Sequence, residues 1–135
     1  FKLTIQNINR NLNPGGLYIF DIFNLDYLKA GNNITKLTGD WMAATDGQKF
    51  REIQFSTISD DGILASYSTY VYQDGNESPT KVSKGYENTL QVYGSDELQD
   101  LLKENGFVVL AQTDINGEAF SKENSERILT IAKKA

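Results

Sequence analysis

The sequence predicts an α/β sheet interrupted by an antiparallel β-meander, which gives the whole chain an α+β character. Helical periodicity and short apolar runs occupy both ends of the chain. The middle is rich in Thr, Tyr, Phe, Val and Ile between turn signals. The length of 135 residues suits one domain with one modest core. We therefore expect residues 1–135 to form a single domain, with residues 36–93 as an antiparallel insertion.

The first elements are a helix, a strand and a second, short helix. Apolar residues recur at helical spacing at Phe1, Ile5, Ile8 and Leu12. The Pro-Gly-Gly sequence at 14–16 ends this helix, because Pro lacks a donor and Gly permits a turn. The apolar run 17–23 predicts a strand buried on both faces, as in a parallel sheet. Asn24 is the expected N-cap of a short helix over 25–30, with Gly31 near its end.

The middle of the chain predicts antiparallel strands. Turn signals at 46–47, 60–62 and 74–76 separate the runs 50–58, 63–73 and 81–93. In the second of these runs, one face mixes aromatic rings with hydroxyl groups and holds Leu64, Ser66, Ser68, Tyr70 and Tyr72. This face either lines a polar pocket or faces water.

The last part of the chain returns to helical periodicity. Ser95 is the expected N-cap of a helix that buries Leu98, Leu101 and Leu102 and ends at Gly106. An apolar strand begins at Phe107, and a loop with Asn-Gly at 116–117 follows it. Residues 128–131 form the final strand, after which Lys133 and Lys134 are expected to end the chain in solvent.

Composition argues against several classes of function. The chain has no Cys and no His, so thiolate and triad-type catalysis and ordinary zinc sites are not expected of it. Its net charge of -5 gives no electrostatic support for binding nucleic acid or anionic lipid. The sequence shows no long apolar run and no secretory signal, and we expect a cytoplasmic protein.

Three stretches carry a family resemblance. Residues 12–21 place Pro-Gly-Gly before a hydrophobic strand that ends in Asp21. Residues 93–107 combine an acidic helix start, a pair of Leu residues and a closing Gly-Phe, and residues 126–134 form an apolar closing strand. In this order they resemble the second half of class I S-adenosylmethionine-dependent methyltransferases. The resemblance implies a partial Rossmann-like sheet. It also implies that residues 36–93 are a substrate-covering insertion, as in a subgroup of bacterial small-molecule methyltransferases.

The sequence departs from this family at the cofactor site. The family holds S-adenosylmethionine with a Gly-rich turn after its first strand and an acidic residue after its second. The eleven glycines of this chain form no G-x-G triplet. The resemblance therefore places the cofactor-binding residues upstream of Phe1, and we expect the isolated chain to bind the cofactor weakly or not at all and to be inactive. It is expected to be marginally stable or to pair with a second copy, because missing strands leave an open sheet edge.

Six residues are candidates for substrate binding, and each has a structural alternative. They are Asp21, Asn24, Tyr27, Trp41, Arg51 and Tyr70. Asp21 and Asn24 follow a strand end, where α/β sheets bind ligands, but both can instead cap backbone amides. Tyr27 and Trp41 either cover the substrate or anchor the core. Arg51 either pairs with a substrate carboxylate or forms a cross-strand ion pair, as Arg127 can also do.

The leading hypothesis is the substrate-side part of a small-molecule methyltransferase. Alignment of nucleophile and methyl group carries much of the rate of methyl transfer, so the lack of His does not argue against it. The second hypothesis is a non-enzymatic module that binds a small ligand on the meander. The third is a structural fragment without activity.

Overall fold

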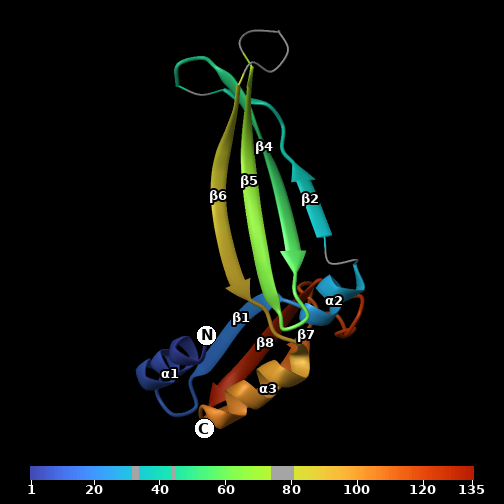
Figure 1. Cartoon of the computed structure of the whole chain (residues 1–135). Coiled ribbons are helices and arrows are strands. Elements are labelled where there is room, and N and C mark those ends of the chain that lie inside the picture. The colour runs from blue at the N-terminus through green and yellow to red at the C-terminus, as the bar shows by residue number, and fades with distance from the viewer. Residues whose placement is uncertain (32–33, 44, 74–80) are drawn as a thin grey trace. The chain divides into compact units, whose positions relative to one another are not determined.

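A computed structural model describes residues 1–31, 34–43, 45–73 and 81–135 of the chain (Figure 1). Two compact units form, and each is described by itself. Unit 1 consists of Phe1–Asn32 and Gln91–Ala135, and unit 2 consists of Asn33–Leu90.

Unit 1 combines a three-stranded sheet with three helices. Its strands are β1 (Leu17–Phe23), β7 (Phe107–Thr113) and β8 (Arg127–Lys134), in the order β1-β8-β7. Both outer strands run antiparallel to β8. The helices are α1 (Lys2–Asn11), α2 (Leu25–Ala30) and α3 (Ser95–Glu104). The predicted fold class is confirmed, as are the short helix over 25–30 and its Asn24 N-cap.

Helices α1 and α3 supply the core of unit 1 on one face of this sheet. The buried side chains of this core come from both helices and two strands, and they are Ile5, Leu98, Leu102, Phe107, Ile128 and Ala132. Tyr18, Phe20 and Ile22 alternate along β1 and pack against this cluster. Two polar contacts also join the helices, because the side chains of Gln6 and Asn9 donate to Asn105 Oδ1 and the Gly106 carbonyl.

The other face of the sheet is apolar and uncovered within the described residues. Leu17 is 52% exposed and Ile19 is 59% exposed on β1, and Val108 is 52% exposed on β7. Leu110, at a bulge of β7, is 54% exposed. The expectation that run 17–23 is buried on both faces and lies in a parallel arrangement is therefore wrong for this chain. Among the described residues, β1 pairs only with β8, and α1 and α3 cover only one face.

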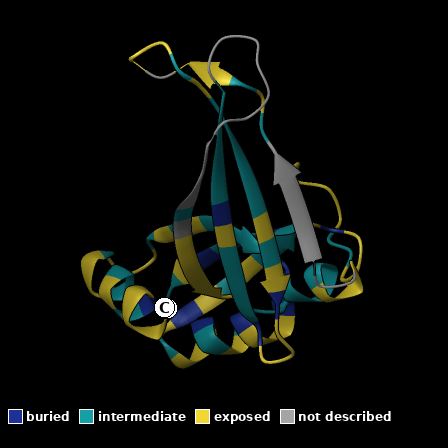
Figure 2. Cartoon of the chain, turned by 45° about the horizontal axis from the view of Figure 1, so that its top comes forward, coloured by how far each residue is buried: buried dark blue, intermediate teal, exposed yellow. Residues whose placement is uncertain are grey.

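Unit 2 is an antiparallel sheet (Figure 1). Its strands are β2 (Ile34–Thr38), β3 (Met42–Ala43), β4 (Lys49–Ile58), β5 (Ile63–Gln73) and β6 (Lys81–Gln91). The order is β2-β4-β5-β6, and β3 also pairs with β4. The three predicted runs coincide closely with β4, β5 and β6, whereas the sequence interpretation named no strand at β2 or β3. Figure 2 shows half-buried residues along most of β4 and β5.

Two sequence expectations at chain and helix ends are wrong. Helix α3 begins one residue earlier than expected, with Gly94 as its N-cap, and the Glu97 carboxylate accepts from the Gly94 N–H at 3.4 Å. Lys134 does not end in open solvent. Its ammonium group donates to the carbonyls of Asn9 and Leu12, at 2.6 and 2.8 Å, and so satisfies the end of α1.

Candidate functional site

The carboxyl-terminal end of β1 carries Asp21, and its carboxylate is already engaged. It accepts a charged hydrogen bond from Nε of Arg127, the residue that opens β8. The Arg127 guanidinium also lies over the Phe23 ring, with 4.4 Å from Cζ to the ring centroid. Both side chains of the ion pair are about one-third exposed. Arg127 thus holds the carboxylate of Asp21 at the sheet face that α1 and α3 leave uncovered.

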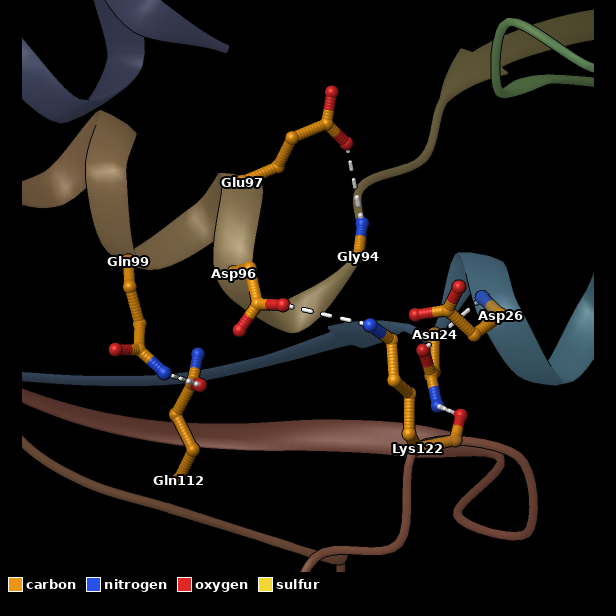
Figure 3. Close-up of polar contacts among 8 residues, drawn as sticks. All are labelled: Asn24, Asp26, Gly94, Asp96, Glu97, Gln99, Gln112 and Lys122. Carbon is orange, nitrogen blue, oxygen red and sulfur yellow. Dashed lines mark hydrogen bonds and ion pairs between the residues drawn. The ribbon is translucent and has the colours of Figure 1, made fainter.

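Asn24 is fully buried and joins three segments of unit 1 (Figure 3). Its Nδ2 donates to the carbonyls of Lys122 and Ser125, both at 2.8 Å. Its Oδ1 accepts from the Asp26 N–H at 3.2 Å, which is the N-cap contact of α2. The side-chain amide thus has its donors and its acceptor occupied by the chain itself. Tyr27 lies half-buried in α2, next to this junction in sequence.

Figure 3 also shows the polar surface around this junction. Lys122 pairs with Asp96 at 3.4 Å, and both side chains are largely exposed. The amides of Gln99 and Gln112 meet at 2.7 Å and join α3 to β7. These contacts are surface and packing contacts, of the kind that contribute little individually to stability.

In unit 2, Trp41 and Arg51 contact each other. The Arg51 guanidinium lies over the Trp41 ring, with 4.8 Å from Cζ to the ring centroid. The buried Nε of Arg51 has no hydrogen-bond partner among the described residues. Within the described part of the chain, Arg51 therefore makes a cation–π contact with the indole and no cross-strand ion pair, which was one alternative for it.

A β-bulge separates β2 from β3 opposite this pair. Thr38 pairs with Ile53 and Met42 pairs with Phe50, so three residues (39–41) face two residues (51–52) of β4. Such a bulge disrupts the ladder locally and redirects side chains, and bulges are common next to binding sites.

A hollow of about 390 Å³ lies at this bulge. Among the described residues it is lined by Gly39, Asp40, Met42, Glu52 and Gln54. Register places Met42, Glu52 and Gln54 on one face of the sheet, because Met42 pairs with Phe50 and alternate residues of β4 share a face. Tyr70 pairs with Glu52 and belongs to the same face, where its ring packs edge-on against Phe50 at 6.1 Å.

Of the six candidate residues, Asp21 and Asn24 lie at the end of β1, and Tyr27 lies in the helix that follows. The other three, Trp41, Arg51 and Tyr70, belong to unit 2. The sequence interpretation did not single out Asp40, Met42 or Gln54. The Gly39-Asp40 dipeptide was the available signal, since a Gly inside a strand pattern often marks a bulge.

No group of three or more acidic residues among those described is arranged to hold a metal ion. Burial raises the pKa of Tyr18, but its ring stacks on Phe20 at 4.2 Å in the core of unit 1. No helix in the described part of the chain is long and apolar enough to cross a membrane.

Solved structures of methyltransferases have a fold similar to that of this chain. A methyltransferase from Clostridium acetobutylicum that depends on S-adenosylmethionine matches 99% of this chain over 50% of its own, with a TM-score of 0.74 and 19% identity. This chain thus has the fold of half a methyltransferase. That match fits the predicted C-terminal part.

Two further methyltransferases show the same relation. CcbJ from Streptomyces caelestis matches 97% of this chain over 51% of its own, with a TM-score of 0.66 and 14% identity. CalS10 from Micromonospora echinaspora is an amino pentose methyltransferase of calicheamicin biosynthesis, solved with S-adenosylmethionine bound. It matches 99% of this chain over 50% of its own, with a TM-score of 0.60 and 11% identity. No protein-family model and no curated protein matches the sequence. The chain therefore spans about half the length of the solved methyltransferases that it resembles.

Proposed function

We propose that this chain is the substrate-side half of a small-molecule methyltransferase that uses S-adenosylmethionine. One observation carries the proposal: the whole chain matches one half of three methyltransferase structures. In this proposal unit 1 supplies part of the central sheet, and unit 2 is the substrate-covering insertion. The proposed location of the protein is the cytoplasm.

The uncovered face of unit 1 supports the proposal that a complementary half packs against this sheet. Exposed apolar side chains of β1 and β7 share one sheet face, namely Leu17, Ile19 and Val108, with Leu110 exposed at the β7 bulge. Soluble proteins rarely leave contiguous apolar patches exposed without a partner. A layer of helices from the complementary half is the proposed cover, with a further strand on the free edge of β1.

The cofactor belongs to that complementary half in this proposal. The Gly-rich turn and acidic residue that would contact S-adenosylmethionine have no counterpart in these 135 residues. When bound, the cofactor supplies an activated methyl group. The residues of this chain would hold the acceptor in line and exclude water, which is the part of the chemistry that depends on positioning.

Calorimetry and co-expression test the proposal together. Titrating the 135-residue chain with S-adenosylmethionine is expected to show no binding of micromolar affinity. If the reading frame or an adjacent gene encodes a Gly-rich strand-turn-helix segment, its co-expression with this chain is expected to give micromolar binding and methylation of a small acceptor. Tight binding by the chain alone would contradict the placement of the cofactor. A stable pair that binds no cofactor would contradict the enzyme proposal.

The hollow of unit 2 favours a second candidate, a non-enzymatic module that binds a small ligand. Ligand binding by the hollow, with no methyl transfer by the co-expressed pair, would select this candidate.

A further inference from the structure

Glu52, which lines the hollow at the bulge of unit 2, has a buried carboxylate oxygen that lacks a donor among the described residues. Oε1 of Glu52 is shielded from solvent and has no hydrogen-bond partner among the described residues. A buried polar atom without a partner destabilises the fold, and it does so more strongly when it is charged. A hydrogen-bond donor or a cation next to this oxygen would therefore stabilise the site.

The neighbouring cation does not serve this carboxylate. Arg51 precedes Glu52 on β4, so the two side chains point to opposite faces of the sheet. The Arg51 guanidinium lies over Trp41, and its own buried Nε is also unpartnered. The alternation of side chains along β4 thus separates the positive group on one face from the negative group on the other.

The other residues that line the hollow indicate which chemical groups a ligand could have. Asp40 adds a second carboxylate from the bulge between β2 and β3, and Met42 adds an apolar wall. The Gln54 amide can both donate to and accept from a hydroxyl group. The volume of about 390 Å³ lies in the range usual for small-molecule sites. An anionic ligand would be repelled by the two carboxylates.

We propose that this hollow binds the protonated amine of a hydroxylated small molecule, with Glu52 as the principal counter-ion and Asp40 as the second. The amine is a recognition group here. Its identity as part of a methyl acceptor rests on the proposed function, whereas its binding to the hollow does not.

Nuclear magnetic resonance titration of the full 135-residue chain tests the binding without the cofactor. The probe is glucosamine, and glucose is its matched neutral control. Glucosamine is expected to shift the backbone amides of Gly39, Asp40, Met42, Glu52 and Gln54, and glucose is expected to shift them far less. Equal responses to the two sugars, or responses confined to other parts of the chain, would overturn the proposal.

Substitutions separate a binding role from a structural role. Glu52→Gln is expected to weaken glucosamine binding at least about tenfold, the effect of losing one charged hydrogen bond. Without ligand, the same variant is expected to keep the melting temperature, because Oε1 of Glu52 has no hydrogen bond to lose among the described residues. Asp40→Asn, at an exposed residue, is expected to weaken binding by a smaller factor without unfolding the sheet.

The matched control is Glu87→Gln, which makes the same chemical change at an exposed residue of β6. It is expected to leave glucosamine binding unchanged. If Glu87→Gln and Glu52→Gln weakened glucosamine binding equally, the effect would come from net charge alone. That result would overturn the assigned site. Because these titrations contain no S-adenosylmethionine, their failure is distinguishable from a failure of methyl transfer.

Discussion

The Lys134 side chain, next to the last residue of the chain, forms hydrogen bonds with the end of the first helix. Its ammonium group donates to two carbonyls at the end of α1, although the two residues and Lys134 are more than 120 positions apart. Carbonyls at a helix end lack partners within the helix, and a cation there also interacts favourably with the helix dipole. The contact therefore ties the last strand to the first helix.

Lys134→Met keeps the apolar stem and removes the donor. It is expected to lower the free energy of unfolding of unit 1 by about 1–2 kcal/mol. Urea unfolding followed by the helical circular dichroism signal measures the loss. Lys133→Met is the control, because Lys133 is exposed. Equal losses for the two variants would contradict the capping role of Lys134.

Gly85 of β6 lies against Ser68 of β5 with no room for a side chain. A Cβ at Gly85 would overlap Ser68 Oγ and would approach the backbone C and O of Ser68 to 3.0 Å. Ser68 is itself buried, so it has little space into which to move. Gly85 therefore permits the close approach of these two strands.

Gly85→Ala is expected to destabilise unit 2 by about 1–3 kcal/mol, the usual cost of overpacking. Trp41, the single Trp of the chain, lies in unit 2 and reports its unfolding by fluorescence. Gly39→Ala is the control, since among the described residues its Cβ would meet only the Glu52 carbonyl, at 3.9 Å. A melting curve for Gly85→Ala that overlays that of Gly39→Ala would refute the packing argument.

At the scale of elements, Asn24 holds the junction between β1, α2 and the loop before β8. Its amide donates to two carbonyls of that loop, and its backbone N–H donates to the Glu126 carbonyl at 3.0 Å. The sequence predicted the N-cap role, because Asn at this place precedes a short helical pattern. It did not predict the two bonds to the loop, because their partners lie about 100 positions away.

Asn24→Asp replaces the two donors with acceptors that face carbonyl oxygens. We expect a loss of about 2–4 kcal/mol in the free energy of unfolding of unit 1, because two buried bonds become repulsive contacts. Chemical denaturation measures this loss. Asn116→Asp at an exposed turn is the control and is expected to change stability by less than about 0.5 kcal/mol. A small effect at Asn24 would mean that the junction is not a stability determinant.

At the scale of the molecule, unit 1 has an apolar sheet face that is uncovered within the described residues. Leu17, Ile19 and Val108 lie on this face, and β1 has a free edge within the described part of the chain. A free edge with apolar neighbours favours pairing with another chain. We propose that the isolated chain pairs with a second copy through this face when the complementary half is absent.

Ile19→Lys is expected to shift the isolated chain toward the monomer without a loss of stability, since Ile19 is 59% exposed. Analytical ultracentrifugation over a range of concentrations measures the shift. Leu3→Lys is the control, because Leu3 is 73% exposed on α1 rather than on the sheet. Unchanged association in Ile19→Lys, or an equal shift in Leu3→Lys, would count against this face.

Local patterns determined most of the elements of this protein. Helical spacing of apolar residues, Pro-Gly-Gly and Asp-Gly turns, and alternation along β5 predicted α1, β1, α2, α3 and the long strands of the meander, because each signal acts over a few residues. The resemblance at 12–21 and 93–107 predicted the partial methyltransferase sheet. The six proposed site residues remain predictions.

Only the tertiary structure decided which faces and edges are used. The uncovered side of β1 depends on where α1 and α3 pack, and the bonds of Lys134 and Arg127 depend on partners about 100 or more positions away. The hollow at Glu52 depends on a one-residue mismatch between the pairings of β2 and β3 with β4. Sequence determined the local elements because propensity and periodicity are short-range. The structure decided the exposed sheet face and the hollow because register and packing join residues that the chain keeps apart.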